Sequence, residues 1–455
     1  MWLVQYGQFP LLASVERSWM SGTQLSGLDV AFLSMEGENT PMHMGAVVTF
    51  RPRKPIDPPK LAVLLAERAA RIPQFRRLAT PAFFPPGAMN WSDDPDFTPL
   101  QHIHLHRVSN LYEPDPLAAY ASRWIAEPLD TSKPLWDLHL VTGLPDNDFA
   151  LLLKLHHALT DGAGAFAIAS GLLDDLTVPA RRKPAVVETS DRSTLDTVLD
   201  TIGSTLSQAS ETASIARSVV RATRPYPISP ITAPSSKERR VGFVRLEMTD
   251  VRRIRKEHGG TANDVILAVL AGALRGWLVN RGQRADGRSL RALIPVSVRA
   301  REAEQVGGNK LSGYLCELPI GEDDPFERLR IVRRAMARNK ASGPSKGAGA
   351  FPLLAGRVPT MLHRLTGKVT GQAAPLLFDT VVTNVPLPNV RMSLDGAQLT
   401  EMYPLVPLAP RQALGFAVSL YRGGIHIGLQ ANGAAVPDIG GLADAVSKSA
   451  AQLLA

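Results

Sequence analysis

Two kinds of hydrophobic pattern alternate along the first part of the chain, residues 25–179. Continuous or alternating apolar runs of four to eight residues are typical of strands, and apolar residues three or four positions apart are typical of helices. A mixture of this kind predicts a protein of the α/β (α+β) class. The expected strands are 46–50, 138–142 and 149–155, and the expected helices are 61–70, 117–125 and 164–173.

The same mixture returns after residue 241, so the pattern indicates two α/β halves of similar size. Thr261 or Asn263 is placed to cap the longest expected helix of this second half. The expected strands are 241–248, 292–295, 310–319, 380–383, 413–419 and 424–429, and the expected helices are 251–258, 264–278, 325–338, 351–365 and 440–454.

A long linker is expected between the halves. Residues 179–194 are charged and irregular, residues 224–240 are rich in proline, and between them apolar residues at helical spacing over 195–219 predict an amphipathic helix. The start of the chain, residues 1–19, lacks the basic region and cleavage site of a signal peptide and is expected to add little to the fold. The predicted division is therefore an N-terminal extension outside the core (1–19), an N-terminal half (20–180), a linker (181–240) and a C-terminal half (241–455).

The composition indicates a folded globular protein but does not distinguish between possible binding partners. With 455 residues, 45% of them hydrophobic and 20% charged, the chain is typical of a folded globular protein. Its net charge of +8 suits nucleic acid, anionic lipid headgroups or a phosphate-rich cofactor equally well. Arginine pairs such as Arg252-Arg253 lack interleaved aromatic residues, so we expect no nucleic-acid partner. The best apolar run, 265–279, is broken by Arg275 and predicts a buried helix with no membrane span.

Neither the single cysteine nor a row of three histidines predicts a metal site. Cys316 is the single cysteine, which excludes an internal disulfide and a cysteine-rich zinc site, and its apolar surroundings predict a buried thiol. His102, His104 and His106 alternate, which places three imidazoles on one face of a strand. No acidic residue or cysteine lies close to them in the sequence, so we expect a half-buried strand and no metal.

The segment His156-His157-Ala158-Leu159-Thr160-Asp161-Gly162 carries the strongest chemical signal. It joins an expected strand to an expected helix, a position that exposes a side chain beside free helix amides. A neutral imidazole is suited to take a proton from an alcohol near neutral pH, and adjacent strand residues face opposite ways, so we expect His156 to pack inward. We expect Asp161 to form an ion pair that holds the shape of the loop; its other possible role is to fix the tautomer of the working histidine. The alternative to a catalytic motif is that both histidines are structural residues buried at a turn.

The motif and six further blocks resemble the bacterial wax ester synthase/diacylglycerol acyltransferase family. The resemblance runs in order from Leu25 to the C-terminus. It departs from the family at Leu387, where glycine is usual, and at Thr98 and Leu100, where members commonly carry acidic residues. The matching blocks are 25–33, 41–45, 128–136 with Pro134-Leu135-Trp136, 153–162, 263–268, 308–312 and 383–388.

The resemblance implies two halves like chloramphenicol acetyltransferase, with mixed sheets and an active site in a tunnel between them. It implies that His157 is the general base in acyl transfer from acyl-CoA to diacylglycerol or a long-chain alcohol, with no cofactor beyond acyl-CoA as co-substrate. We expect a cytoplasmic protein at the surface of membranes or lipid droplets. The residues implied to assist are His156, Asp161, Gly162, Asn263 and Asp264 at the catalytic centre, with Asn263 as our choice of oxyanion donor, and Pro134, Leu135, Trp136 and Asn384 in substrate binding.

Two other functions fit the same sequence features. Condensation domains and related acyltransferases share the double-histidine motif and use thioesters on carrier proteins. A lipid-binding scaffold without activity would use the amphipathic segment 195–219 as an anchor. The intact His157 and Asp161 favour an enzyme over a scaffold.

Overall fold

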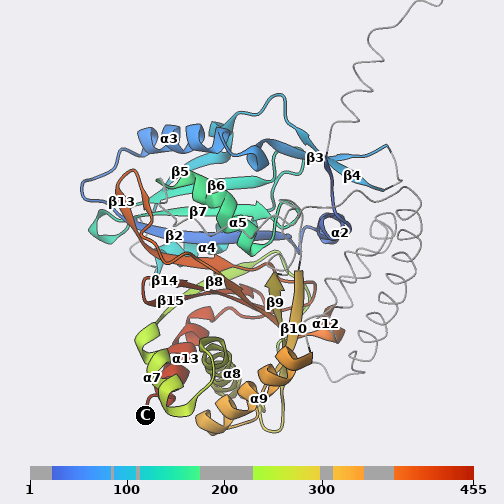
Figure 1. Ribbon diagram of the computed structural model, residues 1–455, viewed down its shortest axis with the longest axis vertical. Helices are drawn as coiled ribbons and strands as arrows, with labels where there is room; N and C mark the ends of the chain where they lie inside the picture. The colour runs from blue at the N-terminus through green and yellow to red at the C-terminus, as the bar shows by residue number, and fades with distance from the viewer. Residues whose placement is uncertain (1–22, 84–86, 109–112, 175–228, 298–310, 343–373) are drawn as a thin grey trace, which may run out of the picture.

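The computed structural model describes residues 23–83, 87–108, 113–174, 229–297, 311–342 and 374–455 (Figure 1). Several expected features lie outside these residues: the extension 1–19, the amphipathic segment 195–219 with most of the linker 181–240, the helix 351–365, and residues 308–310 of one matching block. The helical linker therefore stays a prediction.

The first part of the chain forms short strands interrupted by helices, with caps that the sequence supplies locally. Ser26 and Asp29 form a capping box at the start of α2, and Asp57 and Asp115 cap α3 and α4, each ahead of a proline in the first turn. The elements are β1 (Thr23–Gln24), α2 (Gly27–Met35), β2 (His43–Arg51), α3 (Pro58–Ala70), η1 (Pro73–Arg76), β3 (Arg77–Pro81), β4 (Met89–Asp93), η2 (Pro99–His102), β5 (Ile103–Arg107), α4 (Pro116–Ala126), β6 (Trp136–Thr142), η3 (Pro145–Asn147), β7 (Phe149–His156), α5 (Gly162–Ala169) and η4 (Ser170–Leu172).

The second part has longer helices. Thr261 and Asp264 form the capping box of α8, so the cap is Thr261 and Asn263 lies inside the first turn. The elements are β8 (Arg239–Glu247), α7 (Met248–His258), α8 (Ala262–Asn280), β9 (Leu290–Ser297), β10 (Leu311–Leu318), α9 (Pro325–Ser342), α12 (Ala374–Leu377), β11 (Thr380–Val385), β12 (Ser393–Leu394), β13 (Ala397–Leu405), β14 (Leu414–Tyr421), β15 (Gly424–Asn432) and α13 (Ile439–Gln452).

Two six-stranded mixed sheets organise the described residues, beside a small sheet of β1, β4 and β3. The first sheet has the order β12-β13-β2-β7-β6-β5, and the second has the order β10-β9-β11-β14-β15-β8. Parallel pairing occurs between β5 and β6 and on both sides of β11, whereas the other pairs are antiparallel. These mixed sheets with covering helices confirm the predicted α/β class.

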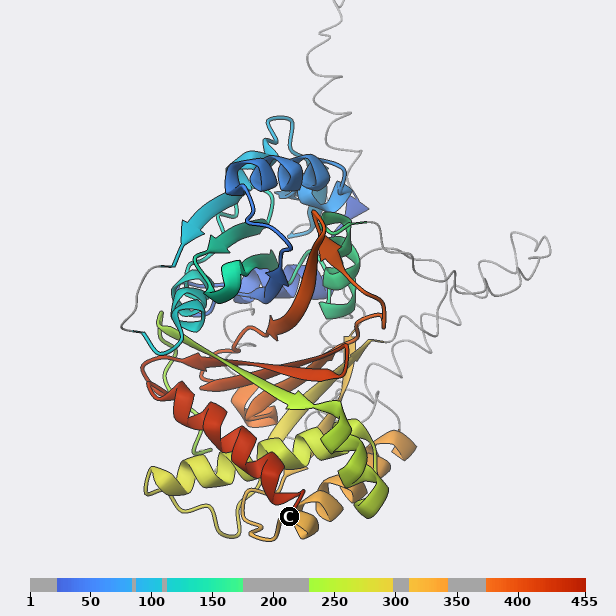
Figure 2. The ribbon, with the colours of Figure 1, turned by 90° about the vertical axis from the view of Figure 1, so that its left-hand side faces the viewer.

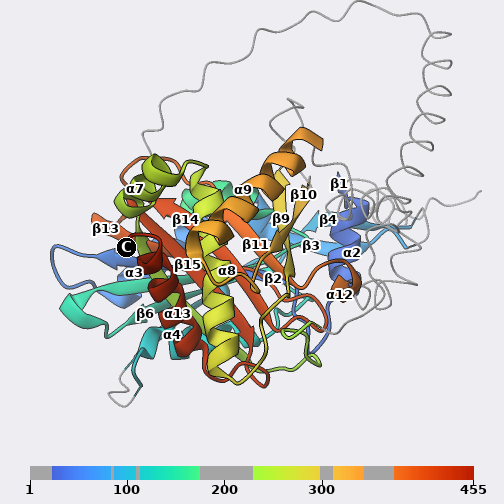
Figure 3. The same ribbon diagram turned by 90° about the horizontal axis from the view of Figure 1, so that it is seen from below.

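The two sheets lie one above the other, each with helices on its outer side (Figures 1 and 2). Helix α3 covers the first sheet, and α7, α8, α9 and α13 form a layer under the second sheet, as the view from below shows (Figure 3). Within the described residues, α8 is the one helix long and apolar enough to cross a membrane, but 67% of its apolar window is buried inside the protein. Arg275 on α8 pairs with Asp286 and Asp323. Helix α8 is therefore a buried core helix, as the sequence predicts.

The halves are not separate stretches of chain. Strands β12 and β13 follow β11 of the second sheet in sequence, but β13 pairs antiparallel with β2 and so extends the first sheet. Figure 2 shows this excursion rising from the lower half into the upper one. A hydrophobic pattern indicates which residues are buried but not which sheet buries them, so this exchange of strands is visible only in the structure. The predicted domain boundaries stay a prediction, and the exchange shows that the halves share strands.

Candidate active site

The central strand β7 delivers the double-histidine motif. All eight of its residues are buried, and β2 and β6 flank it on either side. Leu153 and Leu155 line a cavity, and so does His157, which lies one residue beyond the strand and keeps the same alternation. Lys154 and His156 lie on the other face, where both are buried. Strand periodicity therefore separates the two histidines.

His156 is held on both ring nitrogens. Its Nδ1 accepts a hydrogen bond from the backbone N–H of Ala158 at 3.0 Å, so the ring proton lies on Nε2. Nε2 then donates to the Glu36 carboxylate, which the end of α2 brings to this point. The side chain of His156 is fully buried. These contacts give His156 a structural position that leaves no nitrogen for a substrate.

His157 is positioned by its backbone and by an aromatic stack. Its N–H donates to the carbonyl of Met42 at 2.8 Å, which ties the residue to the start of β2. Its ring stacks on Phe32 of α2, with 4.1 Å between ring centroids and 19° between planes. The stack fixes the orientation of the imidazole, and His157 lines the cavity.

The cavity lies between the two halves and has a volume of about 270 Å³. Its walls come from α2, α5 and strands β2, β7 and β13 of the first sheet on one side, and from β9, β11 and β14 of the second sheet on the other. Methionine, phenylalanine, valine and leucine side chains dominate the lining. Among the described lining residues, His157 is the one titratable side chain, and Thr383 is the other polar one. An apolar pocket with one proton-transfer group suits an uncharged, chain-like substrate. That the cavity continues as a tunnel stays a prediction.

Asp161 and Gly162 shape the turn after the histidines. Asp161 is the N-cap of α5: its Oδ1 accepts from the N–H of Gly164 at 2.9 Å, and the side chain is buried. Gly162 begins α5 and lines the cavity, where a side chain would reach toward Val385 across the pocket. The expected ion pair or tautomer-fixing role of Asp161 stays a prediction beside this capping role.

Pro134, Leu135 and Trp136 support the motif from behind. The carbonyl of Leu135 accepts a hydrogen bond from the N–H of His156 at 3.0 Å. Trp136 is buried, stacks on Phe75, and donates its indole N–H to the carbonyl of Phe75. None of the three is among the described residues lining the cavity, so their observed role is packing.

Three further residues implied by the resemblance lie away from the cavity. Asn263 and Asp264 lie in the first turn of α8, which packs under the second sheet on the side away from the first (Figure 1). Asn384 is exposed, because Thr383 and Val385 on either side of it face the cavity and alternation turns Asn384 outward. The structure does not bring these residues to His157. Their proposed roles as oxyanion donor and substrate ligand stay predictions without a described contact.

The departure at Leu387 is accommodated in this chain. Leu387 packs against the hydrophobic core of the first half. It is not among the described non-glycine residues with positive φ, so its backbone has a conformation that leucine adopts freely. The change from glycine therefore adds an apolar contact without backbone strain.

The three alternating histidines, His102, His104 and His106, each contact different residues. His102 stacks on Trp136 and bonds to its carbonyl through Nδ1 at 2.9 Å, and His106 stacks on Tyr120. His104 instead contacts Asp137. No acidic residue lies close to these histidines in the sequence, but parallel pairing of β5 with β6 brings Asp137 beside His104.

Sequence reasoning missed Phe32 and Glu36. Both lie within or just after a block that resembles the family, but their contacts with His157 and His156 span more than 100 residues of chain. A single glutamate at the end of a helix is usually exposed, so the sequence predicts a surface position for Glu36. Only the pairing of β2 with β7, which aligns His43 with His156, brings the end of α2 to the motif.

Comparison with known proteins agrees with this geometry. The model of the wax ester synthase/diacylglycerol acyltransferase catalytic domain matches residues 25–266, and that of the family's C-terminal domain matches residues 307–453. The chain belongs to the wax ester synthase/diacylglycerol acyltransferase family. It is therefore an acyltransferase, and the resemblance inferred from the motif blocks is confirmed.

Named relatives cover nearly the whole chain. A probable diacylglycerol O-acyltransferase of Mycobacterium tuberculosis is 28% identical over 445 residues, which are 95% of this chain and 96% of the relative. A second one from the same organism is 30% identical over 433 residues, which are 90% of this chain and 94% of the relative. The family assignment thus rests on both halves.

Solved structures show the same fold. The wax ester synthase/diacylglycerol acyltransferase from Marinobacter aquaeolei VT8 matches with a TM-score of 0.71 and 23% identity, over 95% of this chain and 98% of that one. A starter condensation domain of rhizomide synthetase matches with a TM-score of 0.58 and 16% identity, over 97% and 96%. At these identities the matches establish the fold, and they leave the acyl donor open between the two classes.

Proposed function

We propose that this enzyme transfers an acyl group from acyl-CoA to the hydroxyl of diacylglycerol or a long-chain alcohol, with His157 as general base. The observation that carries the proposal is the position of His157, a lone titratable side chain facing an apolar cavity between the two halves. Relatives of similar length are named as diacylglycerol O-acyltransferases, which supports this acceptor class.

The proposed reaction needs one proton carrier. As the acceptor oxygen attacks the thioester carbonyl, the imidazole of His157 takes the hydroxyl proton. The tetrahedral intermediate collapses, the carbon–sulfur bond breaks, and the imidazolium returns the proton to the departing CoA thiolate. The enzyme is left unchanged, so the step balances without a covalent intermediate. Burial raises the pKa of Cys316 to about 12, which makes that thiol a poor nucleophile.

The cavity favours a hydrocarbon chain over a polar substrate. Each methylene group transferred from water into such a lining gains about 0.8 kcal/mol. The developing oxyanion needs a hydrogen-bond donor. The N-terminus of α5, which begins at the cavity-lining Gly162, is better placed for this than Asn263.

The donor and the acceptor are tested together. The purified full chain is incubated with labelled palmitoyl-CoA or with palmitoyl on an acyl carrier protein, and with diacylglycerol or hexadecanol, and the neutral lipids formed are resolved. We expect triacylglycerol or wax ester from the CoA donor and none from His157→Ala. The matched control is His258→Ala, a histidine on α7 outside the cavity lining. Product from His157→Ala at the wild-type rate, or product from the carrier donor alone, would refute the proposal.

We further propose that the enzyme is cytoplasmic and works at the surface of a membrane or lipid droplet, because its acceptors dissolve in lipid. Flotation of the full chain with liposomes containing anionic lipid and diacylglycerol tests this location. Flotation combined with no acyl transfer under any donor would instead support the lipid-binding scaffold.

A further inference from the structure

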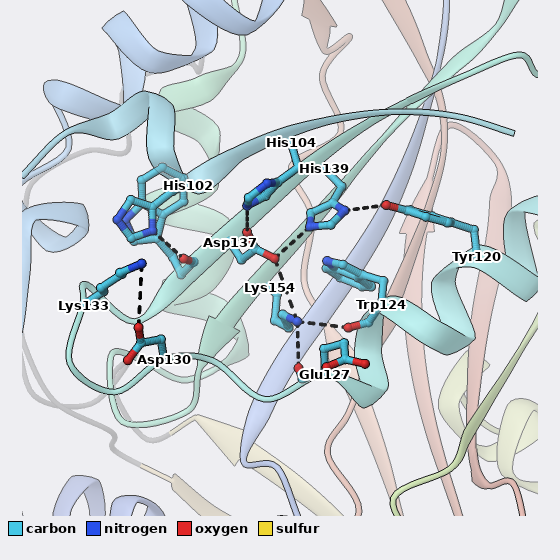
Figure 4. A network of polar contacts seen from close by, with 11 residues as sticks. His102, His104, Tyr120, Trp124, Glu127, Asp130, Lys133, Asp137, His139 and Lys154 are labelled. Carbon is cyan, nitrogen blue, oxygen red and sulfur yellow. Dashed lines mark hydrogen bonds and ion pairs between the residues drawn. The ribbon is translucent and has the colours of Figure 1, made fainter.

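Three side chains of the kind that bind metals meet on the face of the first sheet that α4 covers (Figure 4). His104 lies on β5, Asp137 and His139 lie on β6, and the parallel register aligns His104 with His139. The two oxygens of Asp137 face the two rings: Oδ1 lies 3.0 Å from Nε2 of His104, and Oδ2 lies 2.9 Å from Nε2 of His139. One ligand atom from each residue falls within 4.8 Å of the other two.

We propose that His104, Asp137 and His139 form a binding site for a transition-metal dication, with Zn²⁺ as the best match. Two imidazoles and a carboxylate are a common ligand set for zinc, and a three-residue set leaves a position for water. The ligand atoms already converge, so the ion would replace two hydrogen bonds without moving a strand. The side chain of His104 is 51% exposed, which gives the ion a path from solvent.

Asp137 turns one carboxylate oxygen toward each imidazole, so the three side chains already point toward a common centre. Its side chain is 17% exposed, so its charge is only partly screened by water.

Tyr120 on α4 supplies the outer support of the site. Its hydroxyl lies 2.6 Å from Nδ1 of His139, and His106 stacks on its ring at 3.9 Å. While Nε2 of His139 donates to Asp137, Nδ1 accepts from the tyrosine hydroxyl. When Nε2 binds a metal, the proton moves to Nδ1, which then donates to the same hydroxyl. The hydroxyl serves either tautomer because it both donates and accepts.

Lys154 lies beside the cluster, with its Nζ 3.9 Å from Oδ2 of Asp137. It is held away from the rings, because its Nζ donates to the carbonyls of Trp124 at 3.0 Å and Glu127 at 2.8 Å.

The site lies on the opposite face of the sheet from the cavity, because Asp137 pairs with Lys154, which alternates with the cavity-lining Leu153 and Leu155. In the described part of the chain, strand β5 is an edge of the first sheet and pairs with β6. A metal ion bound by residues of both strands would stabilise the pairing of β5 with β6 at this edge. The inference stands apart from acyl transfer, so its readouts are metal stoichiometry and stability.

The test measures binding of Zn²⁺ to the untagged full chain by calorimetry, and the visible spectrum of the Co²⁺-substituted protein. We expect one equivalent of Zn²⁺ per chain, a rise in Tm with added zinc, and affinity lowered roughly a hundredfold or more in His104→Ala. Tyr120→Phe should still bind, about tenfold more weakly. His104 is half exposed, so its variant is expected to fold, and circular dichroism checks this.

The matched control is His258→Ala, which removes a half-buried histidine beside an acidic residue, Glu257, on helix α7. It should bind zinc like the wild type. Absence of binding by the wild type, or equal binding by His104→Ala, would overturn the proposal and leave the cluster as an ion-pair network.

Discussion

Replacing Glu36 by alanine removes the acceptor for a buried imidazole. Nε2 of His156 donates to Glu36, and its Nδ1 already accepts from Ala158, so the ring cannot turn to another partner without losing the second bond. The histidine is fully buried, and the Glu36 side chain is only 14% exposed. Water therefore has little access to the N–H that the substitution leaves behind.

The expected loss follows from that burial. A buried donor left without an acceptor costs about 1–3 kcal/mol, and we expect Glu36→Ala to lower the free energy of unfolding by that amount. Glu36→Gln keeps an oxygen acceptor and should lose about 1 kcal/mol or less. His157 directly follows His156 in the chain, so we expect a shift of the buried His156 ring to displace the backbone that carries His157. A displacement of about 1 Å there costs on the order of a hundredfold in rate, so kcat should fall tenfold to a hundredfold in Glu36→Ala.

Chemical denaturation with urea and initial rates of acyl transfer measure the two effects. The control is Glu38→Ala, two residues away, which removes a pair with Lys237 whose side chains are 73% and 64% exposed. An exposed pair contributes about 0–1 kcal/mol, and Glu38→Ala should keep the wild-type kcat. If Glu36→Ala matched Glu38→Ala in both stability and rate, the argument that Glu36 holds the motif would fail.

Three further substitutions test neighbouring contacts. Phe32→Leu removes the stack on His157 while keeping an apolar wall, and the loss of about 0.5–1.5 kcal/mol of ring interaction should lower kcat by up to roughly tenfold; an unchanged kcat would contradict this. Asp161→Ala removes the N-cap of α5 and should cost about 0.5–2 kcal/mol in urea denaturation, whereas Asp161→Asn keeps the cap and should cost only a few tenths; equal losses would exclude capping as the cause. Burial, with a smaller contribution from Arg245, lowers the pKa of His426 from 6.5 to about 4, so the unfolded chain takes up a proton first as pH falls. This stability contribution, up to about 3 kcal/mol, is present above pH 6.5 and lost toward pH 4, and His426→Gln should flatten that part of the unfolding profile; an unchanged slope would show that His426 does not carry it.

The sequence by itself predicted the local features of the protein. Periodicity predicted the strand that became β7 and the helix after the motif, and it separated an inward His156 from an outward His157, because alternation is a property of the strand alone. The order of short blocks indicated the family, which the comparisons confirm.

Only the tertiary structure decided which distant residues meet. The end of α2 brings Glu36 and Phe32 to the motif, the register of β5 on β6 makes a cluster of His104, Asp137 and His139, and β13 crosses to the first sheet. The physical reason is common to all of them: a pattern of burial fixes which face of an element is covered, whereas the pairing of strands far apart in sequence fixes what covers it.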